Sequence, residues 1–348
     1  AVLSASQRFD LFRVPVVGRF LRWRHARSVL QACSLAVALA VMLDGWLGPD
    51  VAPLNTAGVI PWVHWRGFVV LALLLVGNLF CMACPFMLVR RPAKRWFGGK
   101  IPWPRPLRSK WLALALLVAF FWAYEAFDIW ASPWLTAWIV FAYFVAAFVV
   151  DAIFRGAAFC KYVCPIGHFH FATSPSSPFE VAVRDADVCA SCTTKDCIRG
   201  RFAEPSTKEG LLQGGCELWL FQHRKVGNLD CTFCLECVHA CPHDNVGLLA
   251  RAPGRELWTD RWRSGVGRLS QRPDVAALVV VLCFVAFLNA FGMITPADQL
   301  ASYLAATVGI TSPALTTLVT FLVGGIAVPL LLVTGAAAWT RGFALEQR

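Results

Sequence analysis

Six long stretches of this chain contain few charged residues, and they constrain the fold more than any other feature. An apolar helix of about 20 residues crosses the roughly 30 Å hydrocarbon core of a bilayer. The chain is 57% hydrophobic and only 15% charged, a composition typical of membrane proteins. We expect six transmembrane helices, at about 28–47, 67–89, 111–130, 133–154, 275–294 and 313–339.

Lysines and arginines gather beside these stretches and predict their orientation. The loop 90–110 is strongly basic, whereas 45–65 and 296–312 contain no lysine or arginine. Because basic residues mark the cytoplasmic loops of membrane proteins, we place both termini and the long polar segment 155–272 in the cytoplasm. The net charge of +11 is then a consequence of topology, and we expect no nucleic-acid partner.

The polar segment contains a regular run of cysteines. Cys231, Cys234, Cys237 and Cys241 follow the pattern C-x2-C-x2-C-x3-C, and Pro242 comes next. Thiolates two residues apart converge on the irons of a [4Fe-4S] cluster only if the backbone curls tightly around it. In two-cluster ferredoxins the fourth cysteine of such a run binds the other cluster, so a second set of cysteines is expected.

A second, less regular set precedes this run. It consists of Cys189, Cys192 and Cys197, followed by the isolated Cys216. We expect two [4Fe-4S] clusters, one held by Cys231, Cys234, Cys237 and Cys216 and the other by Cys189, Cys192, Cys197 and Cys241. Ligand identity is better defined than ligand pairing, because the second set is irregular. The alternative is a structural zinc site, but three cysteines in C-x2-C-x2-C do not suit one tetrahedral ion.

Two of the apolar stretches end in similar motifs. Gly77 to Pro85 contains Cys81 and Cys84, and Gly156 to Pro165 contains Cys160 and Cys164. A duplicated helical hairpin would bring both cysteine pairs to the cytoplasmic face, close to one another. These four cysteines are candidates for a further metal site or a redox-active thiol site. The alternative is that they are small packing residues, since free cysteine behaves as a buried hydrophobe.

Other polar residues are weaker candidates. His168 and His170 follow Cys164 and could bind metal, move protons or simply lie at the interface. We expect Asp151 to pair with an arginine. Glu125 and Asp128 lie near the outer face, where contact with a quinone and plain solvation are equal alternatives.

The paired cysteine-proline motifs, followed by the cluster run, resemble the membrane polyferredoxins of the NapH and NosR type, which accompany periplasmic nitrate and nitrous-oxide reductases. CcoG-like proteins of cytochrome oxidase assembly are also similar. The resemblance covers roughly residues 60–250. It implies a protein of the bacterial inner membrane that passes electrons between the quinone pool, or a cytoplasmic donor, and a redox partner subunit. The motif at Cys81 is one residue shorter than the family pattern.

Taken together, these features predict an α-helical integral membrane protein with an inserted cytoplasmic ferredoxin-like domain. Its expected parts are an amphipathic N-terminal segment, a four-helix membrane part, the two-cluster domain and two final transmembrane helices, at 1–27, 28–172, 173–272 and 273–348. We expect an electron-transfer subunit of a respiratory-type complex rather than a stand-alone enzyme, in contact with lipid, redox partner subunits and quinone. The alternatives are a CcoG-type assembly or sensing factor and a passive membrane anchor.

Overall fold

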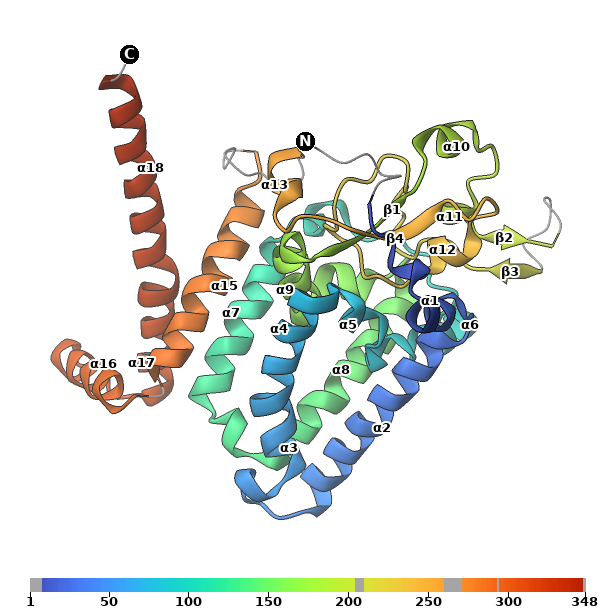
Figure 1. The fold of residues 1–348 in the computed structure, drawn as a ribbon. Coiled ribbons are helices and arrows are strands. Elements are labelled where there is room, and N and C mark those ends of the chain that lie inside the picture. The colour runs from blue at the N-terminus through green and yellow to red at the C-terminus, as the bar shows by residue number, and fades with distance from the viewer. Residues whose placement is uncertain (1–7, 204–209, 260–270, 293, 347–348) are drawn as a thin grey trace.

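In the computed structural model, long helices form a bundle, and a cysteine-rich part with short strands lies across one end of it (Figure 1). The structure describes residues 8–203, 210–259, 271–292 and 294–346. The expectations for 1–7 and for 204–209 and 260–270 of the polar segment therefore lie outside the described residues.

Among the residues that the structure describes, four helices are long and apolar enough to cross a membrane, and two apolar helices are shorter. The long ones are α2 (Ala26–Leu47), the continuous helix Thr56–Val76, α8 (Pro133–Ile153) and the helix Pro313–Arg341. The shorter ones lie in α7 (Trp111–Ala126) and α15 (Pro273–Gly292). Leu71, Leu74 and Leu75 of Thr56–Val76 are each more than half exposed, as expected for a helix that faces lipid.

The second helix lies earlier in the chain than the expected range 67–89. It begins after Asn55, whose side chain accepts a hydrogen bond from the Ala57 amide at 2.8 Å, and ends at Val76. Gly77 then ends the helix with φ 76° and ψ −149°, a positive-φ conformation that glycine adopts at little cost. Arg66 consequently lies inside the helix and not at its outer edge.

The composite helices contain π-helical turns. Thr56–Val76 is made of α3 (Thr56–Val59), η4 (Ile60–His64) and α4 (Trp65–Val76). The last apolar helix consists of α17 (Pro313–Leu322), η10 (Val323–Ala327) and α18 (Val328–Glu346). Two expected loops also contain helices: α16 (Thr295–Val308), and α6 (Arg90–Phe97), which packs on α8.

The cysteine-rich part is built around two small antiparallel pairs of strands. β1 (Phe179–Val183) pairs with β4 (Val246–Ala250), and β2 (Arg201–Phe202) pairs with β3 (Leu211–Gln213). Val181 lies opposite Leu248 in the first pair, and both side chains are buried. The short helices of this part are α10 (Ala186–Ser191), α11 (Asp196–Arg199), α12 (Glu236–Ala240) and α13 (Arg255–Thr259).

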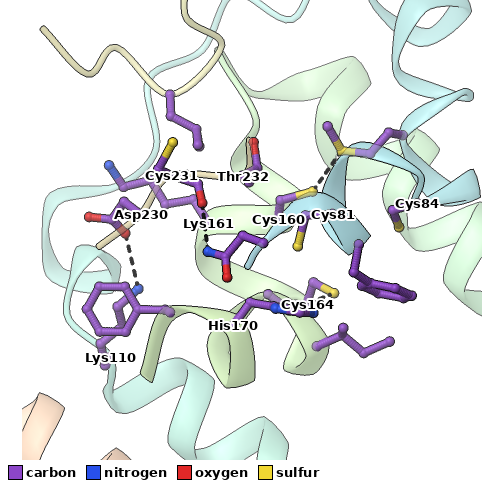
Figure 2. Close-up of a pocket in the computed structure, with 17 residues that line it drawn as sticks. Cys81, Cys84, Lys110, Cys160, Lys161, Cys164, His170, Asp230, Cys231 and Thr232 are labelled. Atoms are coloured by element: carbon purple, nitrogen blue, oxygen red, sulfur yellow. Dashed lines mark hydrogen bonds and ion pairs between the residues drawn. The ribbon is translucent and has the colours of Figure 1, made fainter. Parts of the chain in front are cut away.

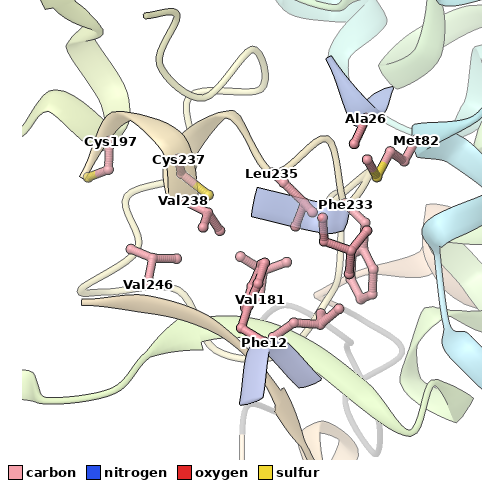
Figure 3. Packing of buried hydrophobic residues seen from close by; sticks show 12 residues of the cluster. Phe12, Ala26, Met82, Val181, Cys197, Phe233, Leu235, Cys237, Val238 and Val246 are labelled. Carbon is pink, nitrogen blue, oxygen red and sulfur yellow. The ribbon is translucent and has the colours of Figure 1, made fainter. Parts of the chain in front are cut away.

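The described part of the N-terminal segment belongs to the cysteine-rich part. It forms η2 (Leu11–Arg13) and α1 (Pro15–Arg22), and Phe12 is buried against Val181 and Leu248 of the strands. Figure 3 shows Phe12 beside Val181, with Met82 and with Ala26, the first residue of α2, in the same cluster. Asp10 also pairs with Arg184 at 2.7 Å. A continuous apolar core therefore joins the N-terminal segment, the strands and the helices.

Candidate functional site

The two cysteine pairs from the apolar stretches line one pocket. Cys81 lies in α5 (Leu79–Met82), and Cys84 precedes η5 (Pro85–Met87). Cys160 lies in η8 (Phe159–Val163), and Cys164 precedes α9 (Pro165–Thr173). Figure 2 shows these four cysteines around the pocket, together with His170 and with Cys231 of the cysteine-rich part. The pocket therefore lies where the helix bundle meets the cysteine-rich part.

The two copies of the motif share a positive φ at the opening glycine and the same φ/ψ at the final cysteine. Gly77 and Gly156, which open the two copies, have φ values of 76° and 72°. Cys84 and Cys164 have φ/ψ values of −62°/122° and −65°/117°. The proline that follows each cysteine favours this extended conformation. The two copies therefore share the conformation of their final cysteine, although Gly77 directly follows α4 and Gly156 lies three residues after the end of α8.

A π-helical turn accounts for the different spacing of the two pairs. In the longer copy the Cys164 amide donates to the Phe159 carbonyl, five residues earlier, at 2.9 Å. In the shorter copy the Ala83 amide donates to the Leu79 carbonyl, four residues earlier, at 3.3 Å. A π turn accommodates one more residue than an α turn. The extra residue between Cys160 and Cys164 therefore does not move either cysteine away from the pocket.

Burial and mutual proximity disfavour charge on these thiols. Burial raises the pKa of Cys84 to about 12, with a further contribution from Cys160. The pKa of Cys81 is also well above its ordinary value, through burial and then through Cys84, Cys160 and Cys164. Several thiolates can therefore coexist here only if a cationic group compensates their charge, as a metal centre does.

The eight cysteines of the cysteine-rich part gather into two groups. Cys237 has Cys234, Cys216 and Cys231 as electrostatic neighbours. Cys197 has Cys189, Cys241 and Cys192, and burial together with these neighbours raises its pKa to about 11. The two groups have the same members as the two expected ligand sets.

Left-handed residues curl the chain around the first group. Phe233 and Leu235 have φ values of 51° and 58°, although neither is glycine and both side chains are buried. This conformation costs about 1–2 kcal/mol per residue, and such cost concentrates at functional sites. The left-handed backbone at Phe233 and Leu235 gives the chain the tight curl that the C-x2-C-x2-C spacing predicts.

Backbone amides donate hydrogen bonds to three of the cysteine sulfurs. Leu220 donates to Cys216 Sγ at 3.3 Å, Asn245 to Cys241 Sγ at 3.4 Å and Gly167 to Cys164 Sγ at 3.4 Å. Such bonds favour a thiolate and tune the reduction potential of iron-sulfur centres.

Buried charges connect the membrane part to the cysteine-rich part. Arg90 donates to Asp151 of α8 at 2.7 Å and also pairs with Glu217. Arg27 of α2 pairs with Glu217 at 3.2 Å and with Glu236 at 2.6 Å. Although burial opposes ionisation, Arg90 and Arg27 hold the pKa of Glu217 down to about 2. The pairing of Asp151 with an arginine is confirmed.

Sequence reasoning missed Glu217 and Glu236 as members of this network. Each lies next to a cysteine of the first group, Cys216 or Cys237, so each ion pair holds a cysteine-bearing loop against the helices. The sequence feature that could have revealed this network is Glu217 itself, because it occupies the position where the ferredoxin pattern has a proline.

The histidines behind Cys164 are buried and neutral. Burial lowers the pKa of both His168 and His170 to about 4. His170 lines the pocket, stacks on Phe80 with ring centroids 5.2 Å apart, and has no hydrogen-bond partner on either ring nitrogen within the described structure. It is therefore a polar group with unused hydrogen-bonding capacity at the pocket wall.

The other candidates lie away from this site. Asn289 donates to Glu125, Asp128 is exposed, and Cys33 and Cys283 are exposed single cysteines. Among the described residues, no group of three or more His, Cys, Asp or Glu is arranged as ligands of a metal ion.

Comparison with known proteins identifies no relative: no family model, no curated protein and no solved structure matches the chain.

Proposed function

We propose that this chain is a membrane-bound iron-sulfur protein of the NapH and NosR type, which transfers electrons for a partner oxidoreductase. The observation that carries the proposal is the exchange of the fourth cysteine between the two groups. Cys241 belongs to the run that starts at Cys231, yet it lies with Cys189, Cys192 and Cys197, while Cys216 lies with Cys231 and Cys237. This exchange is the pattern of two-cluster ferredoxins.

In kind and number, the cysteines of the two groups are those that two [4Fe-4S] clusters require, and binding would draw their sulfurs together. Each group offers four cysteines, and the amides of Leu220 and Asn245 already point to a sulfur in each group. When bound, such clusters accept and release one electron at a time. The chain's contribution is to bury the Cys234 and Cys237 thiols, to curl the loop around them and to supply amide donors.

We propose a membrane arrangement of six spans with both termini and the cysteine-rich part in the cytoplasm of a bacterium. The four long and two shorter apolar helices support it. Both membrane cysteine pairs also lie at the bundle end that carries the cysteine-rich part, next to the basic helix α6. From this position the chain would exchange electrons with quinone or a cytoplasmic donor and with a partner subunit, and lipid would surround the helices.

The test is the iron and acid-labile sulfide content of the anaerobically purified chain, with EPR of the reduced state. The two clusters require about eight irons per chain. Cys234→Ser should remove the signal of one cluster, and Cys33→Ser, at an exposed single cysteine, should change nothing. Iron-free protein would contradict the proposal.

Co-purification separates electron transfer from the alternative of an assembly or sensing factor. A redox subunit should remain bound in constant ratio through purification, whereas an assembly factor should associate only transiently. Cys234→Ser should also stop electron transfer to that subunit; a passive anchor would leave it unaffected.

A further inference from the structure

We propose that Cys81, Cys84, Cys160 and Cys164 hold a third iron-sulfur cluster, at the junction of the membrane helices and the cysteine-rich part. The inference deepens the proposed function and rests on it. In this proposal the two copies of the motif bind one cluster together, and each copy supplies two of its four cysteines.

The first support is the way in which four sulfurs are brought to one pocket. Two copies, each with a positive-φ glycine at its start and the same φ/ψ at its final cysteine, contribute two cysteines each. Cys241, the corresponding cysteine-proline position of the cysteine-rich part, has nearly the same φ/ψ values, −68°/117°. The following proline favours this conformation at all three cysteines, so the evidence for a shared ligand is that both cysteines of each copy line one pocket.

The second support is that the surroundings favour thiolates once a cation is bound. The buried guanidinium of Arg90 donates to Cys160 Sγ at 3.2 Å, and the Gly167 amide donates to Cys164 Sγ. Arg90 is itself fixed by Asp151 and Glu217. Hydrogen bonds of this kind are those that tune cluster potentials in proteins.

The third support is the pocket wall. His170 is 2% exposed, lines the pocket and has no hydrogen-bond partner on either ring nitrogen among the described residues; Phe80 and Phe171 line the same pocket. A buried polar group without a partner is costly, so an acceptor in the pocket would compensate it. The sulfides of a cluster are acceptors of that kind.

The fourth support is the position of the pocket beside the first cysteine group. Cys231 lines the same pocket, and the Asn78 side chain, directly after Gly77, donates to the Cys231 carbonyl at 3.0 Å. The membrane set and the group of Cys231 are therefore neighbours. Of the three sets, the membrane set lies nearest to the apolar helices and to any electron donor dissolved in lipid.

Binding is a ligand exchange that needs no net oxidation. Each of the four sulfurs loses its proton to water and forms a bond to iron, displacing the weaker thiolate ligand of a delivering scaffold protein. The iron and sulfide come preassembled from that scaffold, which is a cluster carrier by chemical class.

The experiment measures iron, zinc and sulfide, with Mössbauer and EPR spectra, on the full chain purified anaerobically. We expect the wild type to hold about ten irons if the third cluster is [2Fe-2S] and about twelve if it is [4Fe-4S]. The double variant Cys160→Ser with Cys164→Ser should lose those two or four irons and keep the spectra of the other two clusters. Cys33→Ser with Cys283→Ser is the matched control and should lose none.

The outcomes separate this inference from the proposed function. About eight irons in the wild type, unchanged in the double variant, would overturn the third cluster and leave the proposed function intact. One zinc per chain that disappears in the double variant would also overturn it, in favour of a single-ion site. A wild type without iron would overturn both. If the double variant does not accumulate, the iron content of the wild type alone tests the third cluster: about ten or twelve irons support it, and about eight contradict it.

Discussion

At the scale of single residues, the junction depends on charges that compensate one another away from water. The side chains of Arg90 and Asp151 are 4% and 2% exposed, and Asp151 also accepts the Phe159 amide at 3.1 Å, at the start of the turn that carries Cys160. Removing one partner of a buried ion pair leaves the other uncompensated and costs about 3–5 kcal/mol. The pair therefore fixes the membrane cysteines as well as the helices.

We expect Asp151→Asn to lower the stability of the chain by about 3 kcal/mol, the low end of that range, because Glu217 still faces Arg90. Arg91→Gln is the matched control: Arg91 is 66% exposed and lies 4.0 Å from Glu236, so its loss should cost less than about 1 kcal/mol. Thermal unfolding in detergent measures both. If the two changes lowered the stability equally, the buried pair would contribute no more to stability than the exposed one.

At the scale of elements, the apolar pattern located the helices, but it could not find where the second one ends. The sequence stays apolar from Gly67 to Val89, while the chain leaves the helix at Gly77 because that residue takes a positive φ. Hydropathy contains no information on such a backbone change. Hydropathy also could not predict the π turn before Cys164. The two motifs therefore differ more in sequence than in structure.

Gly67 inside this helix and Gly77 directly after it should respond in opposite directions to alanine. At Gly77 a Cβ would overlap the Ser177 hydroxyl, and the left-handed φ adds about 1–2 kcal/mol, so Gly77→Ala should destabilise the chain. Gly67 lies inside α4 with open space around it, and Gly67→Ala should be neutral or stabilise by up to about 1 kcal/mol. The difference in thermal midpoint checks this. Destabilisation by Gly67→Ala would mean that this face of the helix is packed in the membrane.

At the scale of the whole molecule, cysteine spacing predicts two ligand sets, and the cysteines that neighbour Cys197 and Cys237 are those of the two sets. The spacing could not predict the joining of the groups to the helices. Glu217 meets Arg27 and Arg90 across more than a hundred residues of sequence, and Phe12 crosses a similar gap to reach the strands. Such contacts depend on the folded topology, which a single sequence does not reveal.

The proposed topology makes a final prediction, because its outer loops contain no lysine or arginine near residues 45–65, 125–132 and 296–312. Trypsin added to intact spheroplasts should therefore cut nowhere, whereas inside-out vesicles should be cut at the exposed Arg201 and Arg224 of the cysteine-rich part. Peptide mass spectrometry identifies the cleaved sites, and detergent-opened spheroplasts control for protease activity. Cleavage at Arg224 in intact spheroplasts would place the cysteine-rich part outside, where an oxidising environment favours disulfides over the thiolates that a cluster requires.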